Sequence, residues 1–209
     1  MRYFPGWDLL AQAASGVLSL NGYPDTDRYY KLPDYLGDFV PGNLGAMSLC
    51  MALYYRNKTG KGQYIDLSQT DSMIRLLPHF TFKSATGETL GRTGHNDPAM
   101  IAASMFKSRD GKILGLACAT EKQFKGLCSA MEKEDLLQDK RFSDYFEALK
   151  EENAEALRAI VADWIKTKDC AEIVKLACEK GFAAAEVVND PMICEDEWRR
   201  ERGSVILFN

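Results

Sequence analysis

A segment rich in glycine and small polar residues interrupts the sequence at residues 84–98 (SATGETLGRTGHNDP). Such a cluster predicts a loop rather than a helix or a strand. Because the pattern of apolar residues changes after it, we expect two domains joined by this loop. The predicted division is a large domain at residues 1–84, a linker at 85–98 and a small domain at 99–189. Residues 190–209 are expected to begin a return to the large domain.

The large domain is predicted to alternate helices with one strand. The expected elements are a helix at residues 8–20, a proline-rich loop at 22–42, a helix at 43–58, a tight turn at 59–62, a strand at 63–67 and a helix at 68–77. Asp8 and Ser68 are suitable N-cap residues for the helices that they precede. The helix at 43–58 is apolar around most of its circumference, so it should be largely buried. This order of elements favours a parallel α/β layer.

The small domain has the pattern of an α+β unit. We expect a hairpin of residues 105–107 and 112–117, helices at 121–131, 153–166 and 169–180, a strand at 182–188 and a charged helix at 190–202. Asp110-Gly111 is a typical hairpin turn. Asp169 and Glu172 have the spacing of a capping box. The apolar residues that end the sequence predict a further strand, whose partner is expected from beyond Asn209 or from another chain.

Composition narrows the class of partner. The 209 residues carry a net charge of −4, and their Lys and Arg residues are scattered, which argues against nucleic acid as a partner. The six cysteines form no C-x-x-C pair and His79 and His95 lack partners at ligand spacing, so we predict no metal site, no disulfide and a cytoplasmic protein. Since no stretch is long and apolar enough to span a bilayer, no membrane partner is expected either.

Several separate segments together resemble one enzyme family. They are GWDLLAQAASG at residues 6–16, LGDFVPG at 36–42, RNKTGKGQYIDLS at 56–68, DGKIL at 110–114 and DKRF at 139–142. Their order and spacing are similar to the family III coenzyme A transferases, the formyl-CoA transferase and carnitine CoA-transferase-like (CaiB/BaiF) enzymes. The resemblance implies an α/β fold, with part of a Rossmann-like large domain followed by a small α+β domain. It also implies that the family's N-terminal portion, which supplies most of the CoA-binding surface, is absent.

The resemblance assigns the nucleophile to Asp38. In the family this aspartate attacks an acyl-CoA thioester, giving a mixed anhydride and then an aspartyl-CoA thioester. A carboxylate suits such an exchange because it resembles the acid substrates. The implied partners are an acyl-CoA and a carboxylic acid, in an interlocked homodimer, with CoA as substrate and no permanently bound cofactor. From the residues alone, Asp38 could instead be a turn or N-cap residue. Asp34 is the nearest alternative candidate for the nucleophile.

Further residues are assigned to substrate binding. Gly37 and Gly42 would let the backbone approach the thioester, where N–H groups could hold an oxyanion. Trp7 lies where related transferases carry an aromatic residue near the substrate, although an aromatic residue before a helix is often a core residue. Gln12 matches a family glutamine that could face the site, and it could equally be an ordinary polar helix residue.

Two alternatives to CoA transfer remain open. The α-methylacyl-CoA racemases share the fold, and Glu121 lies where they place a supporting glutamate. They need a catalytic histidine at the position of Trp7, which cannot titrate, so this reading is weaker. The segment at 118–123 is not the glycine-rich loop of formyl-CoA transferases, so a carnitine-type or other larger acyl group is as plausible as formyl-CoA and oxalate. The second alternative is an incomplete, inactive fragment that retains Asp38.

Overall fold

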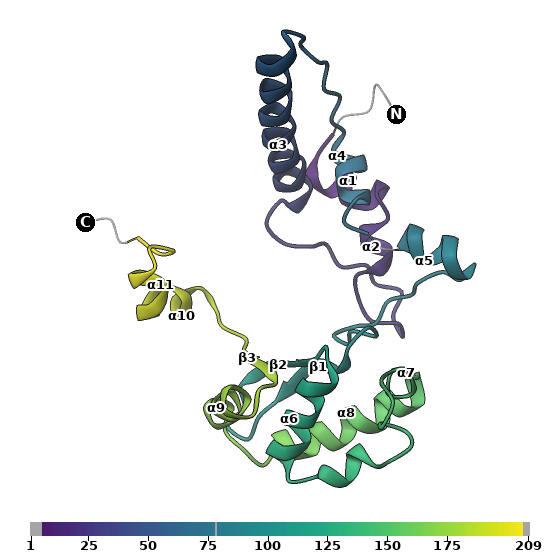
Figure 1. Ribbon diagram of the computed structural model, residues 1–209, viewed down its shortest axis with the longest axis vertical. Coiled ribbons are helices and arrows are strands. Elements are labelled where there is room, and N and C mark those ends of the chain that lie inside the picture. The colour runs from purple at the N-terminus through teal and green to yellow at the C-terminus, as the bar shows by residue number, and fades with distance from the viewer. Residues whose placement is uncertain (1–5, 78, 207–209) are drawn as a thin grey trace. The chain divides into compact units, whose positions relative to one another are not determined.

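The computed structural model describes residues 6–77 and 79–206. The chain divides into two compact units, Met1–His95 and Asn96–Asn209 (Figure 1). The boundary between them falls within the segment predicted as a linker. The predicted domain limits themselves remain predictions.

Short helices and one long helix make up the described part of the first unit. They are α1 (Asp8–Ala14), α2 (Val17–Leu20), α3 (Leu36–Thr59), α4 (Gln69–Ile74) and α5 (His79–Thr86). The single helix predicted at residues 8–20 is broken, because Gly16 adopts a left-handed φ of 87° between α1 and α2. Ser68 caps α4 as predicted, since its Oγ accepts the N–H of Asp71 at 3.3 Å.

Helix α3 begins seven residues before its predicted start, and this changes the setting of the candidate nucleophile. It runs from Leu36 and therefore includes Asp38 and Gly42, which were predicted to lie in a loop. Pro41 was the misleading signal. It cannot donate a hydrogen bond to the carbonyl of Gly37, so one helical bond is missing, but the remaining turns continue.

The prediction that α3 is largely buried is wrong for this chain. Helices α1 and α4 pack against it, and they leave most of its apolar residues in contact with solvent. The exposed large apolar side chains on α3 are Phe39, Met47, Leu49, Met51, Leu53, Tyr54 and Tyr55. An apolar helix can bury its whole circumference only if other elements surround it, and the described residues of the first unit do not supply them.

The strand predicted at residues 63–67 is also absent. This segment is extended without strand hydrogen bonds, and Tyr64 is 91% exposed. A strand needs a neighbour to accept and donate its backbone hydrogen bonds, and the described residues of the first unit form no strand. The parallel layer is therefore not present in the described part of this unit.

The second unit is a small α+β fold. Its elements are β1 (Ile101–Lys107), β2 (Ile113–Cys118), α6 (Glu121–Met131), the 3-10 helix η1 (Glu134–Leu137), α7 (Tyr145–Ala148), α8 (Glu151–Ile165), α9 (Cys170–Lys180), β3 (Ala183–Glu186), α10 (Asp190–Glu195) and α11 (Glu197–Glu201). The strands form an antiparallel sheet in the order β1-β2-β3. The predicted hairpin is confirmed, whereas η1 and α7 were not predicted.

One face of this sheet packs against helices. Leu114, Leu116 and Cys118 alternate along β2 and are buried, as expected for a strand covered on one side. Figure 1 shows α6, α8 and α9 gathered around the sheet. The core continues through Leu157 and Ile173 of α8 and α9, both fully buried.

Local signals at the end of the second unit worked better than long-range ones. The predicted capping box is present, because Asp169 and Glu172 each bond the backbone of the other. The helix predicted at residues 190–202 is two helices, since Asp196 ends α10 and caps α11 by accepting the N–H of Arg199 at 2.8 Å. Residues 204–206 form no strand, and the rest of the predicted terminal strand lies outside the described residues.

Candidate active site

Asp38 lies in the first turn of α3 with its side chain exposed. Its Oδ1 accepts a hydrogen bond from Gln69 Nε2 at 2.6 Å. Gln69 is the first residue of α4 and directly follows Ser68, whose side chain caps that helix, so the backbone at Gln69 is held in place. An amide donor orients a carboxylate without adding a positive charge beside it. The carboxyl group of Asp38 is thus oriented and accessible, as a nucleophile must be.

The hydrogen bond between Asp38 and Gln69 connects two of the segments that resemble the family, residues 36–42 and the segment at 56–68 that leads into α4. The segment at residues 56–68 ends at the cap of α4, and α4 supplies the donor to Asp38. Sequence reasoning missed Gln69. Its position immediately after Ser68, the last residue of the recognised segment, was the available signal.

Asp8 is a buried carboxylate next to the start of α3. It is the first residue of α1 rather than its N-cap, which is Trp7, and only 5% of it is exposed. Oδ1 accepts the N–H of Gly37 at 2.8 Å and Gln12 Nε2 at 2.9 Å, and Lys31 Nζ is 3.3 Å from Oδ2. Burial by itself would raise the pKa of Asp8, but the hydrogen bonds from Gln12 and Gly37 and the nearby positive charge of Lys31 outweigh it and lower the pKa.

Gly37 and Gly42 have different environments. A Cβ on Gly37 would lie 2.9 Å from the carbonyl oxygen of Asp8, so only glycine fits this close approach. The N–H of Gly37 already donates to Asp8, which leaves it engaged rather than free for an oxyanion. Gly42 is exposed in α3, and a Cβ there would meet nothing within 4 Å. Substrate binding by either glycine remains a prediction.

Trp7 and Gln12 lie at opposite extremes of exposure. Trp7 is 73% exposed, so it is not a core residue within this chain. Gln12 is fully buried, and its amide donates to the carbonyl of Leu32 at 3.3 Å and accepts the N–H of Leu32 at 2.9 Å. Gln12 therefore ties α1 to the loop that leads into α3. A direct contact of either residue with substrate remains a prediction.

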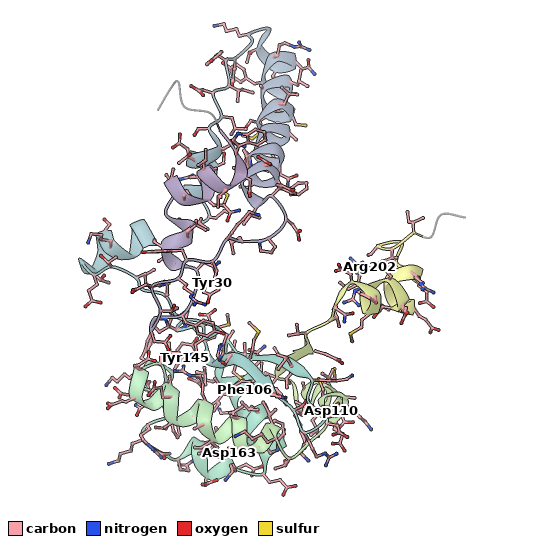
Figure 2. The ribbon with its side chains drawn as sticks, turned by 180° about the vertical axis from the view of Figure 1, so that it is seen from behind. Tyr30, Phe106, Asp110, Tyr145, Asp163 and Arg202 are labelled. Carbon is pink, nitrogen blue, oxygen red and sulfur yellow. The ribbon has the colours of Figure 1, made fainter. Side chains whose placement is uncertain are left out.

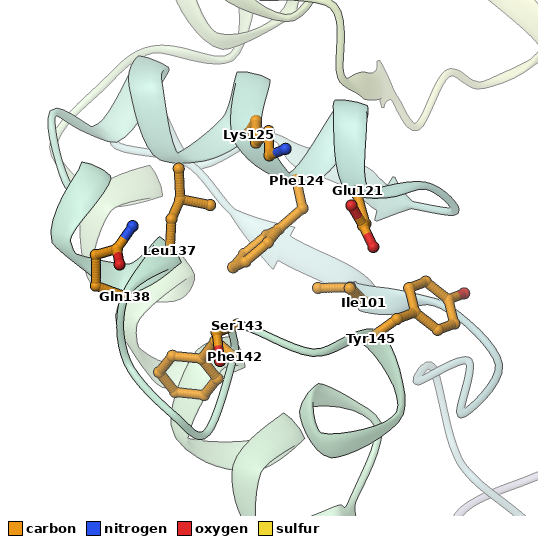
Figure 3. A pocket seen from close by; sticks show the side chains of 9 residues that line it. All are labelled: Ile101, Glu121, Phe124, Lys125, Leu137, Gln138, Phe142, Ser143 and Tyr145. Atoms are coloured by element: carbon orange, nitrogen blue, oxygen red, sulfur yellow. The ribbon is translucent and has the colours of Figure 1, made fainter.

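Glu121 lies in the second unit, at the start of α6. It lines a pocket of about 270 Å³ between α6, η1 and the segment before α7 (Figure 3). Figure 3 shows Glu121 and Tyr145 at one end of this pocket. The apolar walls at Ile101, Phe124 and Phe142 are almost fully buried and offer little surface to a ligand. The role predicted for Glu121 stays a prediction.

The segment at residues 118–123 is fastened at the start of α6. Gln123 Oε1 accepts the N–H of Ala119 at 2.8 Å, and Thr120 caps α6 by accepting the N–H of Gln123 at 3.3 Å. This loop therefore lacks the conformational freedom that a glycine-rich loop would have.

Two recognised segments of the second unit have structural roles. Asp110, labelled in Figure 2, accepts Ser108 Oγ at 2.5 Å and the N–H of Cys170 at 3.2 Å, which fastens the hairpin turn to α9. The hydrogen bond from Ser108 lowers the pKa of Asp110. Asp139 pairs with Arg141 at 2.7 Å, and the adjacent Phe142 enters the core.

The described residues offer neither a reactive thiol at Cys118 or Cys128 nor a metal site. Burial raises the pKa of the thiols of Cys118 and Cys128 to about 12, so neither is a ready nucleophile. No group of three or more His, Cys, Asp or Glu side chains in the described ranges could hold a metal ion. No helix within those ranges has the length and apolar character needed to cross a membrane.

Known proteins with similar sequences are CoA-transferases. The succinyl-CoA:mesaconate CoA-transferase of Haloarcula hispanica is 32% identical over 200 residues, which is 95% of this chain and 48% of that protein. The acetyl-CoA:oxalate CoA-transferase of Acetobacter aceti is 27% identical over 99% of this chain and 54% of its own length. The chain thus spans about half the length of these relatives.

Solved structures share the fold. A CAIB/BAIF family protein from Brucella suis matches with a TM-score of 0.73 and 25% identity, over 95% of this chain and 52% of its own. A Mycobacterium tuberculosis protein that is 20% identical matches with a TM-score of 0.76, over 96% of this chain and 52% of its own. The mixed helix and strand structure is accordingly an α/β fold of the predicted kind. The model of the family described as CoA-transferase family III matches residues 2–208, and the chain belongs to that family.

Proposed function

We propose that the whole protein to which this chain belongs transfers CoA between an acyl-CoA and a carboxylic acid, with Asp38 as the nucleophile. The observation that carries the proposal is the exposed Asp38 carboxylate, oriented by Gln69 at 2.6 Å in the first turn of α3. Membership of CoA-transferase family III supports the reaction class.

The proposed reaction needs no external base. Asp38 attacks the thioester carbonyl carbon, the C–S bond breaks, and CoA leaves as a thiolate. The thiolate then attacks the Asp38 carbonyl carbon of the mixed anhydride, releasing the donor acid and leaving an aspartyl-CoA thioester. The acceptor carboxylate attacks the carbonyl carbon of this thioester, the C–S bond breaks, and a second mixed anhydride forms with release of the CoA thiolate. The thiolate then attacks the acceptor's acyl carbon in this anhydride, which gives the new acyl-CoA and releases Asp38 as a carboxylate.

We further propose that the acceptor is a dicarboxylic acid. Three similar proteins that match 89% or more of this chain are named for succinyl-CoA with mesaconate, for succinyl-CoA with L-malate, and for acetyl-CoA with oxalate. Each of these acceptors carries two carboxylates, whereas the L-carnitine CoA-transferase of Proteus mirabilis, whose named acceptor carries one, matches only 53% of this chain. With succinyl-CoA as donor, a panel of acceptors should therefore show the highest kcat/KM with dicarboxylic acids, and a preference for monocarboxylic acceptors would contradict this choice.

The nucleophile is tested by trapping. The full-length protein is incubated with succinyl-CoA and hydroxylamine, and the Asp38 peptide is examined by mass spectrometry for a hydroxamate. Asp38→Asn should abolish the hydroxamate and lower kcat by about a thousandfold or more, as loss of a nucleophile does. Asp34→Asn is the matched control, because Asn tolerates the left-handed φ of 60° at this position. Full activity in Asp38→Asn would contradict the proposal.

The racemase alternative gives a different result. A racemase would incorporate deuterium at the α-carbon of an acyl-CoA without an acceptor acid, and it would form no hydroxamate at Asp38. Trp7 cannot move a proton, which favours transfer. Observing exchange without transfer would replace the proposed reaction by the racemase reaction.

The proposed partner is a second copy in an interlocked homodimer of the whole protein. The exposed apolar residues of α3, such as Met51 at 68%, support a surface that other elements cover in the assembled protein. Light scattering of the full-length protein should give the mass of a dimer, and Met51→Lys should weaken assembly. We keep the cytoplasmic location as a prediction, which rests on the unpaired cysteines.

A further inference from the structure

The start of α3 lacks a cap of its own. Its N-cap residue, Tyr35, makes no side-chain hydrogen bond to the helix. Asp34 and Tyr35 have φ values of 60° and 54°, a left-handed conformation that residues other than glycine adopt only where their surroundings hold it. The carbonyl of Tyr35 nevertheless accepts the N–H groups of Asp38 at 2.8 Å and Phe39 at 3.0 Å. The turn that carries Asp38 therefore begins on a strained pair of residues.

Asp8 supplies the missing cap from a distant part of the sequence. Its Oδ1 accepts the N–H of Gly37, the second residue of α3, at 2.8 Å. This is the bond that an Asp at the N-cap position would ordinarily make. A buried carboxylate also interacts favourably with the positive end of the helix dipole. Glycine at position 37 permits the close contact, because a Cβ would lie 2.9 Å from the Asp8 carbonyl oxygen.

Contacts that involve Asp8 also hold the loop that contains the strained residues Asp34 and Tyr35. Lys31 Nζ lies 3.3 Å from Asp8 Oδ2 and 5.4 Å from the centroid of the Tyr35 ring. Gln12 bonds both Asp8 and the backbone of Leu32. The contacts of Asp8 thus fasten the loop before α3 as well as its first turn.

We propose that Asp8 is a positioning residue for Asp38, fixing the backbone of the first turn of α3 so that the carboxylate held by Gln69 meets its substrate in a reactive orientation. This inference rests on the proposed function, because it assigns Asp8 a role in the same reaction. Gln69 orients the side chain directly, and Asp8 acts through Gly37 on the adjacent backbone. Neither contact alone fixes both the backbone and the carboxylate.

The test compares Asp8→Ala with Asp8→Asn and Asp8→Glu in the full-length protein, by steady-state CoA transfer from succinyl-CoA. Misplacing a reacting group lowers the chemical step, so Asp8→Ala should lower kcat by about tenfold to about a hundredfold, with KM changed by less than about threefold. Asp8→Asn should retain most of kcat, because Asn caps a helix about as well as Asp. Asp8→Glu keeps the charge but displaces the oxygen, so it should fall below Asp8→Asn.

Asp169→Ala is the matched control for a loss of stability alone. It removes an N-cap from α9, a helix that does not carry Asp38, and it should leave kcat unchanged while lowering the unfolding temperature. An equal fall of kcat in Asp8→Ala and Asp169→Ala, or wild-type kcat in Asp8→Ala, would overturn the proposal. If Asp8→Ala does not fold, Asp8→Glu matching or exceeding Asp8→Asn in kcat overturns it.

A readout without substrate separates this inference from the proposed function. Amide hydrogen exchange at residues 36–39 should be faster in Asp8→Ala than in the wild type, and unchanged in Asp169→Ala. Unchanged exchange in Asp8→Ala would overturn the positioning role whatever the activity. If exchange is faster in Asp8→Ala but the wild-type protein forms no hydroxamate at Asp38, Asp8 does cap α3 and the proposed reaction is wrong.

Discussion

The two units of this chain differ in what they bury. The second unit has a continuous apolar core that runs from the sheet through α6, α8 and α9. The buried residues of the first unit include a few apolar side chains and several polar ones, among them Asp8, Gln12, Ser15 and Ser72. The apolar surface of α3 is instead exposed. The second unit thus derives stability from apolar burial, whereas the first depends on specific hydrogen bonds around the start of α3.

This difference fits the division of labour between the units. Apolar packing dominates the second unit, and the contacts of its recognised segments at Asp110 and Asp139 hold that fold together. The first unit holds the candidate nucleophile in a polar network whose members are fixed by charge and hydrogen bonding. A site of this kind is defined by few contacts, so single substitutions there should alter function more than stability.

The largest difference between the two units is expected when one leucine in each is replaced by alanine. Leu157→Ala in α8 deletes a fully buried side chain and should lower the free energy of unfolding by about 2–5 kcal/mol. Leu49→Ala in α3 deletes a side chain that is 59% exposed and should change it by less than about 0.5 kcal/mol in the isolated chain. Urea denaturation of the chain measures both.

The full-length protein gives the complementary result. If other elements cover α3 there, Leu49→Ala should destabilise the assembled protein more than it destabilises the isolated chain. Equal losses for the two leucines in the isolated chain would show that α3 is already packed, and the contrast between the units would be wrong.

Substituting one helical glycine in each unit should also change stability differently in the two units, by smaller amounts. A Cβ on Gly126 of α6 would overlap the carbonyl of Lys180, so Gly126→Ala should destabilise the second unit by about 1–3 kcal/mol. A Cβ on Gly42 of α3 would meet nothing within 4 Å, so Gly42→Ala should stabilise the helix by up to about 1 kcal/mol. Thermal unfolding should give shifts of opposite sign. A loss of stability in Gly42→Ala would mean that an unseen contact approaches α3 in the isolated chain.

Sequence reasoning succeeded where the determining contacts are local. The turn at Asp110-Gly111 and the capping box of Asp169 and Glu172 lie within a few residues of the elements that they define. Helices α6, α8 and α9 of the second unit were therefore predicted to within a few residues. The short elements η1 and α7 have too few residues to show a periodic pattern.

It failed where the determining contacts are distant. The bond from Gly37 to Asp8 joins residues 29 positions apart, and that from Gln69 to Asp38 joins residues 31 apart. Neither can be derived from spacing on one helix or strand. The exposure of α3 had a different cause, because an apolar pattern indicates burial only where other elements surround the helix, and the described residues of the first unit do not supply them.

The smallest expected effect concerns acid stability, and it separates the buried carboxylate of the first unit from an exposed one in the second. The pKa of Asp8 is below the ordinary aspartate value of 3.8, because the hydrogen bonds to its carboxylate outweigh the effect of burial. Its charge therefore stabilises the fold fully above about pH 3.8, and this stabilisation is lost as the pH falls further towards the folded pKa. Asp8→Asn should flatten the fall in stability over that range, measured by amide exchange in α1 and α3.

Asp169, whose pKa is lowered mainly by Arg109 but whose side chain is 43% exposed, is the control. Asp169→Asn should change the acid dependence of α9 less, because water screens an exposed ion pair. If the acid dependence of stability changes equally or more in Asp169→Asn, the charge of Asp8 contributes no more to stability than a surface ion pair does. The start of α3 would then be held by the positions of its hydrogen-bond partners and not by a buried charge.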